Sequence, residues 1–171
     1  MNQARPDAPT LLRDDHDLEN FTSGLTSLDD WLRRRARGNQ MSGASRTYVV
    51  TVADTPQVIA YYALAAGAVV AASEVPGRFR RNMPDVIPVS VLARLAIDRA
   101  WQGRGLGRAL VRDAALRVEQ AASVIGIRGL LVDAISEDAK AFYEALGFTA
   151  LREPPLTLVA TLADLRRALD G

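Results

Sequence analysis

A glycine-rich turn between an apolar strand and a helix is the feature of this 171-residue chain that most constrains its fold. The segment Val89–Asp98, VSVLARLAID, alternates apolar residues and predicts a strand. The sequence QGRGLG follows at residues 102–107, and from Gly105 onward apolar residues recur about one helical turn apart. Glycines permit positive φ, and the first N–H groups of a helix are unpaired and favour negative charge. The turn therefore predicts a site for a phosphate or a diphosphate.

Two common phosphate-binding motifs do not fit this turn. A Walker loop needs a Gly-Lys-Ser/Thr tripeptide, but the chain has one lysine, Lys140, and no such tripeptide. A dinucleotide fingerprint requires a third glycine where this chain has Arg108. It also requires an acidic residue about 20 positions later, and Glu119 is poorly placed for that role. A glycine-rich turn without a ligand remains the alternative at this stage.

The rest of the chain alternates predicted strands and helices. A helix is predicted over residues 27–40, beginning with a Ser or Asp cap candidate, and a short one over residues 136–148, stopped by Gly147. Residues 163–171 predict a terminal helix or a frayed tail, and residues 73–88, with three prolines, an exposed loop or short helix. Further strands are predicted over residues 45–53, 57–70, 129–135 and 155–162. This alternation indicates an α/β or α+β fold with a central sheet.

Length and composition exclude several classes of protein. The length predicts a single domain over residues 1–171, and no apolar run approaches the roughly 20 residues that span a bilayer. The N-terminal segment lacks the apolar core of a secretory signal, so a cytoplasmic protein with no membrane partner is expected. The chain has no cysteine and one histidine, His16, which argues against disulfides, thiol catalysis and a Ser-His-Asp hydrolase. No cluster has zinc-ligand spacing, so no metal is expected, and His16 is expected in a surface or capping role.

Two motifs in register resemble one known family. The pattern Gln102-x-x-Gly105-x-Gly107 after an apolar strand resembles the pyrophosphate loop of GCN5-related N-acetyltransferases (GNATs). Downstream, LLVDAISEDAKAFYEALGF resembles that family's second cofactor-side strand and the helix after it. The resemblance implies a mixed, mostly antiparallel central sheet, splayed at the acetyl-CoA strand and flanked by helices. It assigns residues from about 89 to 148 to the acetyl-CoA half of the domain.

The resemblance also implies which residues bind acetyl-CoA. Backbone groups of the strand would pair with the pantetheine arm like an added strand, and N–H groups of the loop would hold the diphosphate. Arg104 and Arg108 could add charge-assisted hydrogen bonds. The implied cofactor-binding residues are Leu95, Ala96, Ile97, Gln102, Gly103, Arg104, Gly105, Leu106, Gly107 and Arg108.

Tyr143 is the catalytic candidate. Amine acetylation expels a thiolate, and related acetyltransferases place a general acid in the helix where Tyr143 lies. From the residues alone, Tyr143 fits an apolar stripe with Ala139, Phe142 and Leu146 and would be a core residue. The resemblance instead makes Tyr143 catalytic and leaves Phe142 as the better core candidate. No general base is assigned. The four acidic residues considered for that role are Asp98, Asp133, Glu137 and Glu144.

The N-terminal half narrows the resemblance. From about Leu11 to Leu162 the chain looks closely like acetyltransferase toxins of bacterial toxin–antitoxin systems, with one departure at Ser23, where relatives often carry a cysteine. That likeness implies acetylation of the α-amine of aminoacyl-tRNA, which blocks translation, and neutralisation by a ribbon-helix-helix antitoxin. It also raises a homodimer as an option. An aminoacyl ester lowers the pKa of its amine below the ordinary value of about 7.7–8.0, so such a substrate needs no strong base.

Arginine clusters are the candidate contacts for tRNA. All but one of the 21 basic residues are arginines, although the net charge is only +1. An acidic antitoxin tail or plain solvation could explain the same side chains. The candidate tRNA contacts are Arg78, Arg80 and Arg81 in one cluster and Arg34 and Arg37 in another. The alternative functions are an N-acetyltransferase of a protein or small-molecule amine, and a non-catalytic CoA-binding or DNA-associated module.

Overall fold

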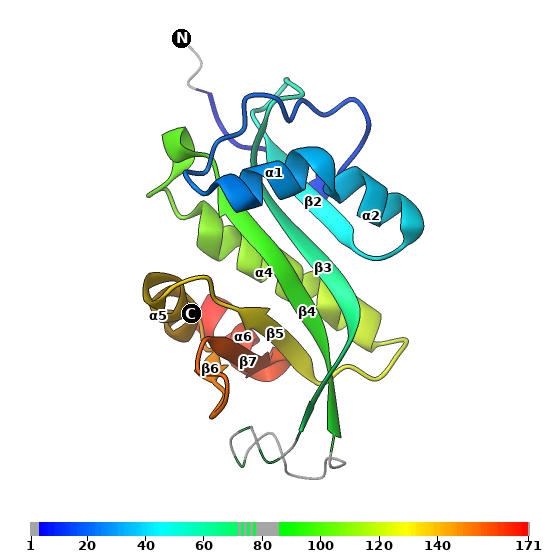
Figure 1. Cartoon of the computed structure of the whole chain (residues 1–171), viewed down its shortest axis with the longest axis vertical. Helices are drawn as coiled ribbons and strands as arrows, with labels where there is room; N and C mark the ends of the chain where they lie inside the picture. Colours follow the sequence, from blue (N-terminus) through cyan, green and yellow to red (C-terminus); the bar gives the residue numbers. More distant parts are fainter. Residues whose placement is uncertain (1–3, 72, 74, 76, 78–85, 171) are drawn as a thin grey trace. The chain divides into compact units, whose positions relative to one another are not determined.

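The computed structural model of the chain describes residues 4–71, 73, 75, 77 and 86–170 (Figure 1). The chain forms two compact units, and both β3 and β4 contribute to each of them. The first unit comprises residues 4–65 and 93–111 of the described chain, and the second comprises residues 66–92 and 112–170. None of the described helices is long and apolar enough to cross a membrane.

Helices and strands alternate along the chain as the sequence indicates. The strands are β1 (Thr10–Leu11), β2 (Arg46–Thr51), β3 (Val58–Ala71), β4 (Val86–Ile97), β5 (Gly129–Asp133), β6 (Thr149–Ala150) and β7 (Thr157–Thr161). The helices are α1 (Thr26–Arg34), α2 (Ala36–Ser42), the short 3-10 helix η2 (Arg99–Trp101), α4 (Leu106–Ala122), α5 (Glu137–Ala145) and α6 (Leu162–Asp170).

The strands are ordered β1-β2-β3-β4-β5-β7-β6. In the first unit β2 pairs antiparallel with β1 and β3. In the second unit β4 and β5 are parallel, and β7 pairs antiparallel with β5 and β6. The predicted mixed, mostly antiparallel sheet is therefore confirmed. Two-residue strands such as β1 and β6 leave no alternating pattern, so the sequence did not predict them.

Three local predictions are wrong. The helix predicted over residues 27–40 is two helices, because Arg35 leaves helical geometry at φ −120° and ψ −31°. No Ser or Asp side chain caps α1; Leu25 is the N-cap residue and makes no side-chain cap bond. The predicted loop over residues 73–88 ends early, because β4 begins at Val86 and Ile87 is fully buried.

Each unit has its own apolar cluster. In the first unit, Tyr61 is buried at the centre of contacts with Phe21 and Trp31, whose ring centroids lie 5.6 and 6.0 Å from its own. In the second unit, buried Val89 of β4 and Val159 of β7 belong to one cluster. Ala96 of β4 belongs to the cluster of the first unit, and Ile87 and Val89 belong to that of the second. β4 is the strand that is predicted to bind the pantetheine arm.

One glycine of the second unit is required by close packing. A Cβ on Gly129 would lie 2.2 Å from the carbonyl oxygen of Ala160 in β7, which is shorter than any real contact. Only glycine can therefore begin β5 in register with β7, where Gly129 pairs with Thr161. At the end of α5, Gly147 has φ +101°, which confirms the predicted stop of that helix.

Candidate active site

The glycine loop has the geometry that the sequence predicts. After β4 the chain makes the short helix η2, and α4 begins at Leu106. Gly103 and Gly105 have φ of +79° and +82°, while Gly107 lies inside the helix. A Cβ on Gly103 or Gly105 would meet no heavy atom within 4 Å, so these positions need glycine for their backbone conformation and not for space. The space beside these two glycines is therefore open, and they precede the start of α4, where the first N–H groups of a helix favour an anion.

Gln102 fastens this loop to the rest of the first unit. Its Nε2 donates hydrogen bonds to the carbonyl oxygens of Ile97 and Ser23, both at 2.9 Å. The carboxylate of Asp98 accepts hydrogen bonds from the N–H groups of Ala100 and Thr22, at 3.0 and 3.1 Å. Both oxygens of this buried carboxylate are thus used for structure, which makes Asp98 a poor candidate for a general base.

β4 extends beyond its ladder with β5. The parallel pairing ends at Leu92 opposite Val132, whereas β4 continues to Ile97. An unpaired strand edge presents N–H and C=O groups to which an extended ligand can bond like an added strand. Leu95, Ala96 and Ile97, the predicted pantetheine contacts, lie in this extension.

Two arginines belong to the loop and the first turn of α4. Both Arg104 and Arg108 are exposed. The guanidinium carbon of Arg104 lies 4.6 Å from the centroid of the Trp101 ring, a cation–π contact that keeps this side chain on the loop. The loop therefore carries a positive charge next to its N–H groups.

Tyr143 belongs to the second unit, on α5. Ser136 caps this helix by accepting a hydrogen bond from the N–H of Ala139 at 3.1 Å. The Tyr143 ring packs edge-on against Phe142 and Phe148, with centroids 5.0 and 5.4 Å away. Tyr143 is only 7% exposed and Phe142 is partly exposed, so the expectation that Phe142 is the better core residue is wrong.

Burial controls the acidity of Tyr143. It raises the pKa of the phenol above its ordinary value of about 10, because the phenolate would lose its hydration. The side chain is therefore protonated at neutral pH, the form in which a general acid begins. In the part of the chain that the structure describes, its hydroxyl has no hydrogen-bond partner.

The remaining acidic candidates gain no support as a base. Asp133 accepts a hydrogen bond from the Thr157 hydroxyl at 2.6 Å. Glu137 and Glu144 are exposed on α5. Catalysis without a general base from the protein therefore stays a prediction.

The arginines predicted to contact tRNA differ in their surroundings. Arg78, Arg80 and Arg81 lie outside the described residues. Arg34 is exposed on α1. Arg37 is used within the protein, because its Nη2 donates to the carbonyl oxygen of His16 at 2.7 Å and approaches those of two neighbouring residues.

His16 caps a turn, as expected, but it is buried and not on the surface. Its Nδ1 accepts a hydrogen bond from the N–H of Arg13 at 2.9 Å. Burial lowers the pKa of the imidazole below its ordinary value of about 6.5, and the charges of Arg13 and Arg37 act in the same direction.

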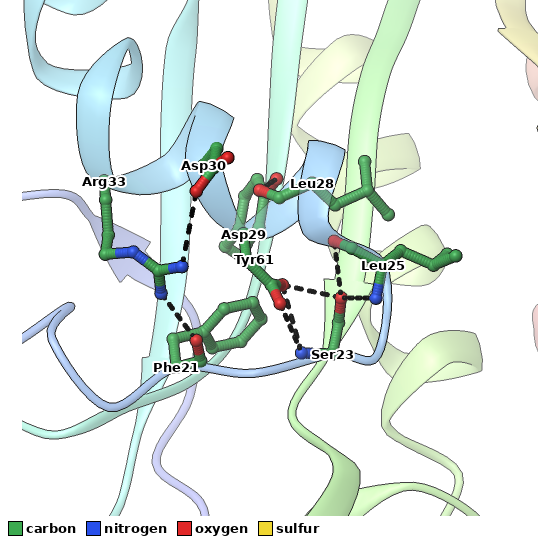
Figure 2. Close-up of polar contacts among 8 residues, drawn as sticks. All are labelled: Phe21, Ser23, Leu25, Leu28, Asp29, Asp30, Arg33 and Tyr61. Atoms are coloured by element: carbon green, nitrogen blue, oxygen red, sulfur yellow. Dashed lines mark hydrogen bonds and ion pairs between the residues drawn. The ribbon is translucent and has the colours of Figure 1, made fainter.

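A buried polar cluster at the start of α1 was not predicted (Figure 2). Both oxygens of Asp29 accept from the N–H of Ser23, at 3.0 and 3.1 Å, and the Ser23 hydroxyl donates to Asp29 at 2.6 Å. The Tyr61 hydroxyl donates to the carbonyl oxygen of Leu28 at 2.7 Å. Arg33 donates to the carbonyl oxygen of Phe21 at 2.7 Å. A Ser–Asp pair six residues apart matches no common capping pattern, so the sequence offered no signal for this cluster.

The fold and the glycine loop together define an acetyltransferase of the GNAT class. The profile described as "Acetyltransferase (GNAT) domain" matches residues 45–150, so the chain belongs to that family. It is 49% identical over 164 residues, 96% of each chain, to the tRNA-acetylating toxin of Mycobacterium tuberculosis.

Three solved structures share the fold over nearly the whole chain. A tyrosine-to-phenylalanine mutant of KacT has a TM-score of 0.86 and 28% identity, covering 97% of this chain and 99% of its own. AtaT in complex with acetyl-methionyl-tRNAfMet has a TM-score of 0.86 and 30% identity, covering 96% and 98%. A tyrosine-to-phenylalanine mutant of the AtaT toxin, bound to the C-terminus of the antitoxin AtaR and to acetyl-CoA, has a TM-score of 0.79 and 30% identity, covering 99% and 100%.

Proposed function

We propose that this protein is an acetyl-CoA-dependent N-acetyltransferase toxin that acetylates the α-amine of aminoacyl-tRNA in the cytoplasm and so blocks translation. The observation that carries the proposal is the 49% identity, over 96% of both chains, with a tRNA-acetylating toxin. A protein of this kind needs an acetyl-CoA site, a proton donor for the leaving thiolate and access for a charged tRNA end.

The glycine loop and the end of β4 form the proposed acetyl-CoA site. Gly103 and Gly105 have positive φ and open surroundings just before the N-terminus of α4, a setting that suits a diphosphate. Arg104 adds positive charge there. The β4 extension, Leu95–Ile97, offers its edge to the amide groups of the pantetheine arm.

Tyr143 is the proposed general acid. The amine nitrogen forms a bond to the thioester carbonyl carbon, the carbon–sulfur bond breaks, and the phenol proton passes to the sulfur. The buried ring is held by two aromatic neighbours, and the hydroxyl is not engaged by any described residue. Burial keeps the phenol protonated until the thiolate forms.

The acceptor explains why no base is required. The ester bond of an aminoacyl group withdraws electrons from the α-amine and lowers its pKa below the ordinary range of about 7.7–8.0. Enough neutral amine is then present at physiological pH. The proton lost from nitrogen passes to water.

A cognate antitoxin of the ribbon-helix-helix type would hold the toxin inactive, and a toxin homodimer is part of the same proposal. AtaT, which shares the fold, is solved with the C-terminus of AtaR. Exposed Arg34 is available for the tRNA or for an acidic antitoxin tail. Either contact should weaken steeply with salt.

The test is transfer of labelled acetyl from acetyl-CoA to a pool of charged tRNA. Label should appear on the aminoacyl group with wild-type protein, and should be absent with uncharged tRNA or with Tyr143→Phe. If acetyl-CoA binds but no charged tRNA is labelled, the toxin function is wrong and the acceptor is a protein or a small amine.

A further inference from the structure

Arg94 lies on the strand that carries the proposed thioester site, and it forms no ion pair with a carboxylate of the described residues. It precedes Leu95–Ile97 in β4 and is partly buried. Its Nη1 donates to the carbonyl oxygen of Ala93 at 2.7 Å, and its other guanidinium donors bond to none of the residues that the structure describes. Among the described residues no carboxylate lies within ion-pair distance of it. A cation that has lost part of its hydration in this way is suited to an incoming anion.

An aromatic stack holds Arg94 in place. Its guanidinium carbon lies 5.3 Å from the centroid of the Trp31 ring. Trp31 in turn stacks on buried Tyr61, with centroids 6.0 Å apart and the ring planes within 8°. The guanidinium is therefore supported by a ring that is itself fixed in the apolar cluster of the first unit.

The buried polar cluster at the start of α1 fixes this stack further (Figure 2). The hydrogen bond from Tyr61 to the Leu28 carbonyl joins β3 to α1, and the contacts of Asp29 with Ser23 close the turn before that helix. The charge of Arg94 lowers the pKa of Tyr61 and the charge of Asp29 raises it. The oxygens of Asp29 accept their hydrogen bonds from Ser23. Arg94 is thus preorganised, and it forms no direct ion pair with the Asp29 carboxylate.

The chemistry of this pair favours a nucleotide over a carboxylate ligand. A guanidinium fork matches two phosphate oxygens, and a guanidinium plane lying on an indole can extend the stack to a base. We propose that Arg94, supported by Trp31, binds a phosphate at the 3′ end of the acceptor tRNA and so positions the aminoacyl group beside Leu95–Ile97. The inference rests on the proposed function, because it takes that strand segment to hold the thioester.

Steady-state kinetics of Arg94→Met test the inference. Methionine keeps an unbranched apolar stem against Trp31 and removes the charge. KM for charged tRNA should rise about 10- to 100-fold, the value of a charge-assisted hydrogen bond, while KM for acetyl-CoA stays within about twofold. The slope of log KM for tRNA against log salt should fall by about one, which a purely structural residue would not change. Arg5→Ala, which removes a charge from an exposed arginine, is the matched control and should leave both constants unchanged.

Two further variants separate the contribution of the Arg94 charge from those of its forked shape and of the Trp31 ring. Arg94→Lys keeps the charge but loses the fork, so its KM for charged tRNA should lie between those of wild type and Arg94→Met, and it serves if Arg94→Met unfolds. Trp31→Leu should raise KM for tRNA in the wild-type background and have little effect once Arg94 is methionine, because the two residues act together.

The outcomes distinguish the inference from the function on which it rests. If wild-type protein labels no charged tRNA, both are wrong. If wild type labels charged tRNA but Arg94→Met has an unchanged KM for it, only the role of Arg94 is overturned. A rise confined to KM for acetyl-CoA would mean that Arg94 binds a cofactor phosphate. Weaker inhibition by an acidic antitoxin tail, with KM for tRNA unchanged, would make it a protein contact instead.

Discussion

Replacing Tyr143 by phenylalanine separates the function of its hydroxyl from that of its ring. Phenylalanine keeps the edge-on contacts with Phe142 and Phe148. Because the hydroxyl bonds to no described residue, its removal breaks no internal hydrogen bond. We therefore expect the free energy of unfolding to change by less than about 0.5 kcal/mol.

The same substitution should lower kcat for acetyl transfer by about 10²- to 10⁴-fold, the usual contribution of a general acid. That range corresponds to about 2.7–5.4 kcal/mol of activation free energy. Tyr143→Ala is the contrasting variant, because it also removes the buried ring and should cost about 3–5 kcal/mol of folding stability. Single-turnover transfer assays and urea unfolding of the same preparations measure the two effects separately.

Two results would refute this reasoning. A Tyr143→Phe enzyme with more than about one-tenth of wild-type kcat does not lack its general acid, since the expected loss is at least about a hundredfold. A loss of more than about 1.5 kcal/mol of stability would mean that the hydroxyl has a structural partner.

Alkaline unfolding offers an independent check on the buried phenol. Burial raises the pKa of both Tyr143 and Tyr61 above the ordinary value, so the unfolded chain releases these protons at a lower pH than the native protein does. Below about pH 10 neither state is affected, and above it each tyrosine lowers the free energy of unfolding by about 1.4 kcal/mol per pH unit. Tyr143→Phe should remove one such contribution from the slope, as measured by urea unfolding between about pH 10 and 11.

Three further substitutions test the glycine loop and the buried histidine. Gly105→Ala and Gly43→Ala both place a side chain at positive φ in open space, so each should cost about 1–2 kcal/mol of stability, but only Gly105→Ala should raise KM for acetyl-CoA. Equal KM values for the two variants would contradict the diphosphate site. Because burial lowers the pKa of His16, the wild-type free energy of unfolding should fall as the pH drops below about 6.5, by at most about 1.4 kcal/mol per pH unit. His16→Asn, which keeps an acceptor but does not titrate, should show a flatter profile in urea unfolding, and an identical profile would refute the assignment.

Local patterns predicted the strand, glycine loop and helix well. Positive φ at Gly103 and Gly105, the start of α4 and the stop at Gly147 all depend on residues within a few positions of one another. Such features follow from backbone sterics and helix periodicity, which a short stretch of sequence contains in full. The family and the acetyltransferase activity, expected from these motifs, are confirmed.

Sequence patterns did not distinguish buried from exposed side chains where several residues share one face of a helix. Helical spacing put both Phe142 and Tyr143 on the apolar stripe of α5, and the resemblance, which made Tyr143 catalytic, favoured the wrong one as the core residue. Helix periodicity also continued through Arg35, where the chain in fact breaks into two helices. Periodicity states which side of an element is apolar, but the packing partners decide how deeply each side chain is buried.

The sequence by itself thus determined the class of fold, the positive-φ glycine loop and the place of Tyr143 on a short helix, because each of these is encoded by neighbouring residues. Only the tertiary structure decided what the arginines do. Arg37 donates to the carbonyl of His16, whereas Arg94 lies on Trp31 with no carboxylate beside it among the described residues. In composition these two side chains are equivalent. They differ because folding brings distant backbone carbonyls to one guanidinium and an aromatic ring to the other.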